Sequence, residues 1–78
     1  MRLLATEKAV MKIESENVIT VEADPRKGKE EIKKEAEELF EVNVEKIRTH
    51  LRGNKKFAYL KLNKDSQAID VATKMGIM

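Results

Sequence analysis

The sequence predicts an α+β fold, in which a mostly antiparallel sheet of the split βαβ type carries helices packed on it. A strand, a helix and a second strand follow one another, and such a crossover leaves its two strands parallel. A tight hairpin then adds a last strand, which fits most simply between the two crossover strands. With 78 residues the chain can build one thin core, so we expect residues 1–78 to form a single domain.

The chain opens with the patterns of a short extended segment and a helix. Arg2-Leu3-Leu4 fits the extended segment, and Thr6 fits the N-cap of the helix. Glu7 then lies in the first turn, where the helix dipole favours an acidic side chain. The apolar residues of this helix are Ala9, Val10 and Ile13.

A strand and the central helix come next. Residues 17–23 alternate in polarity, and Pro25 ends this strand because it has no backbone N–H for a ladder. Gly28 is an acceptable N-cap for a helix over residues 29–40. We expect its apolar stripe to enter the core, so that truncation of Leu39 leaves a cavity. The stripe consists of Ile32, Ala36, Leu39 and Phe40.

Two strands over residues 47–52 and 56–63 form the hairpin, because Gly53-Asn54 suits a two-residue turn. One face of the hairpin is largely apolar and contains Ile47, Thr49, Leu51, Ala58, Leu60 and Leu62. The other face combines cations with aromatic rings and contains Arg48, His50, Arg52, Lys55, Phe57, Tyr59 and Lys61.

A short helix over residues 66–74 closes the pattern. Asp65 or Ser66 is its expected N-cap, and Gly76 follows its end. Met11 and Met75 are expected to fill the core or the edges of helices.

The charge distribution is the most informative feature of the composition. The whole chain has a net charge of +2, but residues 46–64 hold seven Lys or Arg side chains and no acidic residue. A local field of one sign attracts a polyanion such as nucleic acid. The alternative is a solvated hairpin whose lysines discourage edge-to-edge aggregation.

The residue inventory argues against several other classes of protein. The absence of cysteine and the single histidine remove disulfides, thiolate sites and His-rich metal clusters. We find no catalytic or nucleotide-binding motif, and so expect no enzyme, no catalytic residue, no cofactor and no metal. The longest apolar run spans residues 57–60, too short for membrane insertion, and no leader suggests secretion, so the expected location is the cytoplasm.

Phe57 and Tyr59 allow two interpretations. They pack against a helix or cover the hairpin, or they form a stacking platform for RNA bases between phosphate-binding lysines. The pattern alone leaves both open.

Several short motifs, in their order and spacing, resemble ribosomal protein L-twenty-three of the large subunit over essentially the whole chain. They include Thr6-Glu7-Lys8-Ala9 and the stretch from Ile32 through Glu38-Leu39-Phe40 to Lys46-Ile47. The hairpin Gly53-Asn54-Lys55-Lys56 with Ala58-Tyr59-Leu60-Lys61-Leu62 is similar to the rRNA-binding signature of that family. The tail Ala68-x-Asp70-Val71-Ala72-x-Lys74-x-Gly76-Ile77 resembles its archaeal-type members.

The resemblance implies a structural, ribosome-bound protein that binds large-subunit rRNA near the exit of the peptide tunnel. It implies ribosomal protein L-twenty-nine as a neighbour, and the signal recognition particle, the translocon or chaperones as docking partners. In bacterial members the docking patch lies at the start of the first helix, which corresponds to Ala5, Thr6 and Glu7 here.

Three departures from the family pattern matter. Phe57 separates Lys56 from Ala58, which puts a second phosphate contact in doubt. Arg48 precedes Thr49 where archaeal members often have Asn, which adds charge. The turn Gly53-Asn54 is too short to reach into a tunnel, as expected of an archaeal-type member.

Together, charge pattern and resemblance give a set of candidate RNA-binding residues. The set is Arg2, Lys8, Lys46, Arg48, Thr49, His50, Arg52, Gly53, Lys55, Lys56, Tyr59 and Lys61. The alternative function is a free-standing protein-interaction module whose basic hairpin docks an acidic partner. A small-molecule sensor on a ferredoxin-like sheet needs a pocket for which the sequence gives no sign.

Overall fold

The computed structural model describes residues 2–76, so Ile77, the last residue of the tail motif, lies outside it. The elements follow in the order β1 (Arg2–Leu3), α1 (Glu7–Glu16), β2 (Val18–Ala23), α2 (Lys29–Phe40), β3 (Val44–Arg52), β4 (Lys55–Leu62) and α3 (Ala68–Lys74).

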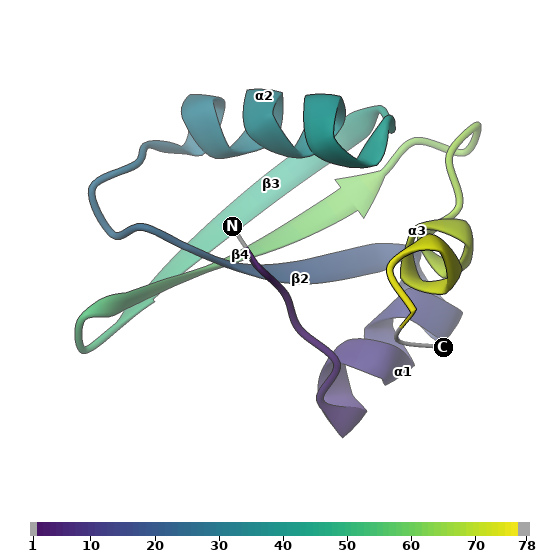
Figure 1. The fold of residues 1–78 in the computed structure, drawn as a ribbon, viewed down its shortest axis with the longest axis horizontal. Coiled ribbons are helices and arrows are strands. Elements are labelled where there is room, and N and C mark those ends of the chain that lie inside the picture. The colour runs from purple at the N-terminus through teal and green to yellow at the C-terminus, as the bar shows by residue number, and fades with distance from the viewer. Residues whose placement is uncertain (1, 77–78) are drawn as a thin grey trace.

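The four strands form one sheet in the order β1-β2-β4-β3, and all three neighbouring pairs are antiparallel. Since β2 and β3 both run antiparallel to β4, they are parallel to each other, and α2 makes the crossover between them. The last strand of the chain is therefore inserted between the crossover strands, which confirms the predicted split βαβ arrangement (Figure 1).

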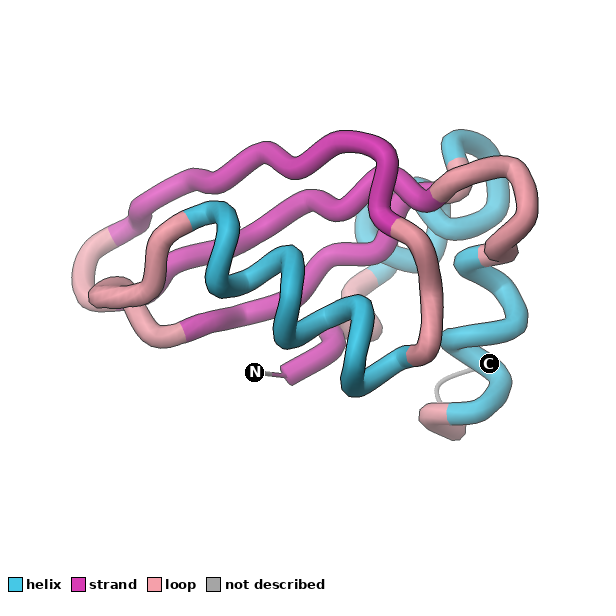
Figure 2. The backbone as a smooth tube through the Cα atoms, turned by 90° about the horizontal axis from the view of Figure 1, so that it is seen from above, coloured by secondary structure: helices cyan, strands magenta, loops and turns pink. Residues whose placement is uncertain are grey.

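Helix α2 lies along one face of the sheet, whereas α1 and α3 lie at the end of the sheet away from the β3–β4 turn (Figure 1 and Figure 2). One core joins these layers. Its largest fully buried side chains are Ile19, Ile32, Leu60, Leu62 and Val21.

Strand β3 begins earlier than the expected residue 47 because of a β-bulge. Val44 pairs with Leu62 and Lys46 with the next residue, Lys61, so Glu45 has no partner in the register. The extra residue allows Val44 and Ile47 to share the core side of the sheet and places Lys46 on the other side. This shift breaks the period-two pattern, which is why the sequence did not reveal the first part of the strand.

The expected N-caps of α3 are wrong. The helix begins at Ala68 with Gln67 at the N-cap, and the side chain of Gln67 makes no capping hydrogen bond. Asn17 supplies the cap from the other end of the chain, since its Oδ1 accepts from the Ala68 N–H at 2.7 Å and its Nδ2 donates to the Ser66 carbonyl at 2.9 Å. The Ser66 hydroxyl instead accepts from the backbone N–H of Asn43 at 3.1 Å.

Three apolar residues expected in or beside the core lie at the surface. Leu39, Met11 and Met75 are 54%, 61% and 49% exposed. On α2 the buried arc runs through Ile32, Ala36 and Phe40, and Leu39 lies on the edge of that arc, beyond the reach of the sheet.

Candidate nucleic-acid interface

The β3–β4 hairpin places the predicted cationic and aromatic residues on one face. Residues directly opposite each other in an antiparallel ladder point to the same side of the sheet. Four such pairs lie on the side away from α2, and we call these eight residues the basic face. The pairs are Lys46 with Lys61, Arg48 with Tyr59, His50 with Phe57, and Arg52 with Lys55.

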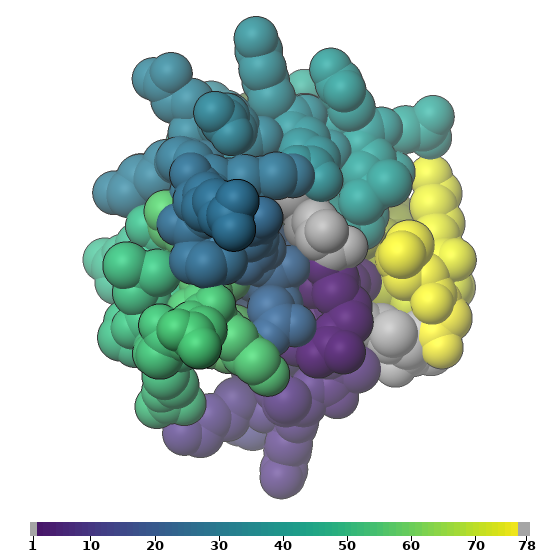
Figure 3. All heavy atoms as spheres, turned by 60° about the vertical axis from the view of Figure 1, so that its left-hand side comes forward, coloured from purple at the N-terminus to yellow at the C-terminus, as the bar shows by residue number. Residues whose placement is uncertain are grey.

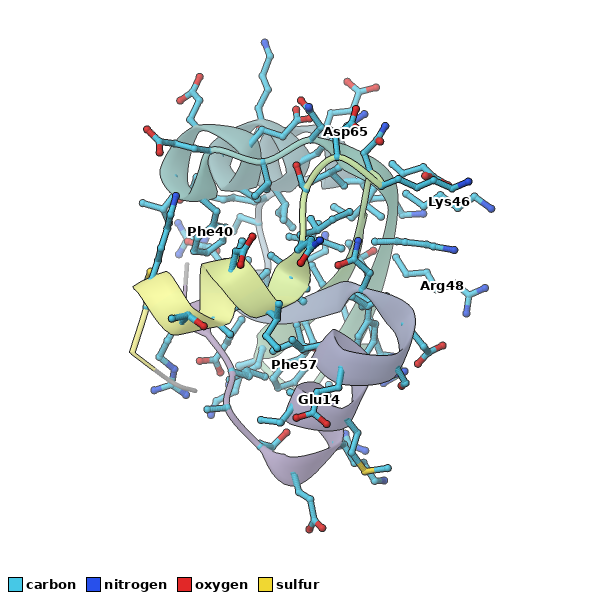
Figure 4. The ribbon with its side chains drawn as sticks, turned by 90° about the vertical axis from the view of Figure 1, so that its right-hand side faces the viewer. Glu14, Phe40, Lys46, Arg48, Phe57 and Asp65 are labelled. Atoms are coloured by element: carbon cyan, nitrogen blue, oxygen red, sulfur yellow. The ribbon has the colours of Figure 1, made fainter. Side chains whose placement is uncertain are left out.

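The cations of the basic face project into solvent. Lys46 and Arg48 extend from β3 on the side away from α2 (Figure 4). In the turn that connects β3 and β4, Gly53 adopts a φ of 63°, a left-handed conformation that glycine adopts without a steric penalty. The hairpin end lies at the surface beside the chain segment that leads into α2 (Figure 3).

Glu22 neutralises part of the charge near the turn. It lies opposite Phe57 in the β2–β4 ladder, and its side chain is 20% exposed. One carboxylate oxygen lies 3.2 Å from Arg2 and the other 3.5 Å from Lys55. Two of the candidate RNA-binding cations therefore share one acid that the sequence pattern did not connect with them.

Two further candidates lie on the other side of the sheet. Thr49 is opposite Ala58, and Lys56 is opposite Ala23, so both share the face that α2 covers. The Lys56 ammonium donates to the backbone carbonyl of Lys27 at 2.6 Å. The adjacent lysines of the turn thus point to opposite sides of the sheet.

Lys27 itself is tied to the central helix. Its ammonium donates a hydrogen bond to the Glu35 carboxylate, and this bond raises the pKa of Lys27 above its usual value. The Lys56 contact therefore links the hairpin to the loop before α2. It also means that the Lys56 ammonium already has a hydrogen-bond partner within the protein.

Helix α1 adds a cation that the sequence analysis did not select. The Lys12 ammonium lies 5.3 Å from the centre of the Tyr59 ring and 3.6 Å from Glu16. No pattern in the sequence connects residue 12 with residue 59, because their proximity depends on how α1 packs against the sheet.

The structure confirms that Thr6 is the N-cap of α1 and that Glu7 lies in its first turn. The Thr6 hydroxyl accepts a hydrogen bond from the Ala9 N–H at 3.2 Å, which makes Thr6 the N-cap. Ala5, Thr6, Glu7 and the candidate RNA contact Lys8 are all exposed.

Within residues 2–76 the acidic and histidine side chains form no cluster that could hold a metal ion. Among the same residues, the helices are all too short and too polar to cross a membrane. The chemistry that the described surface offers is the electrostatic binding of an anion together with stacking on aromatic rings.

Comparison with known proteins identifies the family of this chain. Residues 1–73 match the family model described as Ribosomal protein L23. The chain is 43% identical to the large ribosomal subunit protein uL23 of Pyrobaculum aerophilum, over 99% of this chain and 96% of the relative. It is also 43% identical to uL23 of Trypanosoma brucei brucei, where the match covers 96% of this chain and 46% of the longer relative.

Proposed function

This chain belongs to the ribosomal protein L23 family, and from that premise we propose that its basic face binds large-subunit rRNA near the exit of the peptide tunnel. A protein of this family is a structural component of the large subunit and not an enzyme. The question for this chain is therefore which of its surfaces meets the RNA.

The observation that carries the proposal is the division of the sheet into two unlike faces. One face is covered by α2, whose sequence contains five Glu and three Lys, whereas the other presents Lys46, Arg48 and Lys61. Within residues 2–76 these three cations form no ion pair with an acidic side chain. Each is thus available to neutralise a phosphate and release a condensed counterion.

The contacts are of the kind that positions a protein on RNA. Phosphate contacts fix register and orientation but read no base sequence. Arg52, Lys55 and His50 extend the same face toward the turn, where Gly53 lets the backbone approach closely. We therefore assign recognition to the shape of a folded rRNA junction.

A charge-reversal pair tests this assignment. The variant Arg48→Glu with Lys61→Glu should lower affinity for a large-subunit rRNA fragment by more than tenfold and flatten its salt dependence. The control Lys29→Glu with Lys34→Glu makes the same change in net charge on α2 and should leave affinity within about threefold. Equal losses in both folded variants would show that net charge, and not the basic face, governs binding.

The start of α1 is proposed as a separate docking patch for factors that meet the nascent chain, such as the signal recognition particle, the translocon or chaperones. Support comes from the exposure of Ala5, Thr6 and Glu7 at the start of α1. A neighbouring position for ribosomal protein L-twenty-nine belongs to the same proposal.

The docking patch is tested by Glu7→Lys in assembled large subunits. Binding of the signal recognition particle, followed by co-sedimentation, should fall, while incorporation of the chain into the subunit stays at the wild-type level. Normal co-sedimentation of all three classes of factor would remove Glu7 from the patch.

A further inference from the structure

A groove lies between α1 and the basic face. It is open to solvent along one side and has a volume of about 670 Å³. Its lining comes from three parts of the chain: α1, the start of β2, and the β3–β4 hairpin. The residues that matter here are Lys12, Lys46, Arg48, Tyr59 and Lys61.

The charge around the groove strongly favours an anion. Four cations line it, from α1, β3 and β4, and Glu16 is the one acid among the lining residues. Glu16 already lies 3.6 Å from Lys12. By contrast, Arg2 and Lys55 near the turn share Glu22. Within residues 2–76, Lys46, Arg48 and Lys61 at the groove form no ion pair, whereas Lys55 at the turn contacts Glu22.

The aromatic ring of the groove, Tyr59, is covered by the flexible side chain of Lys12. Tyr59 is partly buried, and the ammonium of Lys12 lies over its ring at 5.3 Å. An exposed cation–π contact is weaker than the stacking of a nucleic-acid base on an aromatic side chain. A base can therefore replace Lys12 at the ring, and the released ammonium then gains a phosphate as its partner.

We propose that this groove holds a single unpaired RNA nucleotide, whose base stacks on Tyr59 in place of Lys12 while its phosphates contact Arg48 and Lys61. The inference rests on the proposed function and deepens it. A paired base in an A-form helix cannot present its flat face to a side chain, so the groove selects an extruded nucleotide. The protein then distinguishes an RNA that has an extruded nucleotide at this position from one that does not, which phosphate contacts alone cannot do.

The test uses two RNAs that differ by one nucleotide. One is a duplex with a single bulged adenine, and the other is the same duplex without the bulge. Tyr59 is the only tyrosine and the chain has no tryptophan, so its fluorescence reports directly on the ring. The wild-type protein should bind the bulged duplex about tenfold more tightly and lose tyrosine fluorescence on binding.

Variants separate stacking from charge. Tyr59→Leu should abolish the preference for the bulge but keep the salt dependence, whereas Tyr59→Phe should retain the preference because it retains the ring. Lys12→Ala should keep the preference and lower the salt slope by about one phosphate contact. The control Lys34→Ala, on the exposed surface of α2, should change neither quantity.

The outcomes distinguish the two claims. Equal, salt-dependent binding of both duplexes with unchanged tyrosine fluorescence overturns the nucleotide site but leaves the basic face as an RNA-binding surface. Failure to bind either duplex at low salt overturns both. Loss of the preference in folded Tyr59→Phe would show that the hydroxyl, and not the ring, recognises the bulge, which also contradicts stacking.

Discussion

At the scale of single residues, Glu22 limits how readily two of the candidate RNA-binding cations can bind a phosphate. Its carboxylate lies on β2, yet it contacts Arg2 from β1 and Lys55 from β4. Such contacts are partly solvated and each contributes little to stability. Their larger effect is on binding, because a phosphate must compete with Glu22 for these two cations.

The variant Glu22→Gln should therefore strengthen RNA binding. Removing the carboxylate frees two cations, so affinity for an rRNA fragment should rise several-fold at low salt, and the salt slope should increase by about one to two phosphate contacts. Titrations at a series of salt concentrations measure both quantities. Glu14→Gln, which removes an exposed acid from α1, is the matched control, and an equal rise in that variant would contradict a specific role for Glu22.

At the scale of elements, Asn17 connects α1 to α3. It ends α1 with a left-handed φ of 57°, and its side chain then caps α3, which begins 51 residues later along the chain. Its amide also lies 3.4 Å from the Leu62 carbonyl, at the end of β4. One side chain thus connects α1, α3 and the end of β4.

Substitution of Asn17 tests this connection. Asn17→Ala removes the cap and replaces asparagine, which tolerates the left-handed conformation, with alanine, which adopts it at a higher cost, and we expect it to lower the free energy of unfolding by about 2–3 kcal/mol. Asn17→Gly relieves the backbone and loses only the hydrogen bonds, so it should cost less than Asn17→Ala. Urea unfolding followed by circular dichroism measures both, and equal stability of Asn17→Ala and wild type would contradict the capping role.

Helix α2 shows how far a helical stripe predicts burial. Ile32 is fully buried and Leu39 is 54% exposed, although the sequence pattern places both on one stripe. Ile32→Ala should therefore cost about 2–5 kcal/mol through a core cavity. Leu39→Ala should cost less than about 1 kcal/mol, as is usual for surface positions. Thermal or urea unfolding of the two variants compares them directly, and similar losses would place Leu39 in the core after all.

At the scale of the whole molecule, the hairpin shows what the sequence can predict. Period-two alternation assigned the residues of β3 and β4 to their two faces, and the register confirms that assignment from Ile47 onward. Family membership, the α+β fold and the inserted strand are confirmed as well. These features depend on local patterns or on the order of elements.

The features that sequence analysis missed depend on how the elements pack together. The bulge at Glu45 interrupts the alternation, so the start of β3 was not visible. Glu22, Asn17 and Lys12 reach their partners only after β2 and α1 have docked on the sheet, and no local spacing encodes those contacts. The site residues chosen from the sequence remain predictions. For those in the strands, the register shows on which side of the sheet each one lies.

The charge of the molecule is arranged in two layers. The acid-rich helix α2 covers one face of the sheet, and the basic face lies on the opposite side of the β3–β4 hairpin, next to α1. The chain therefore has one side suited to RNA. Such a charge arrangement orients the protein as it approaches RNA, and it also stabilises the complex once it has formed. The chain should therefore adopt one defined orientation on the ribosome.

A cryo-electron microscopy map of large ribosomal subunits that contain this chain tests that orientation most directly. The basic face should lie against rRNA, with phosphate oxygens within about 3 Å of the charged nitrogens of Lys46, Arg48 and Lys61. Helix α2 should then face away from the RNA. A map in which α2 lies against rRNA and these three cations project into solvent would contradict the proposed orientation.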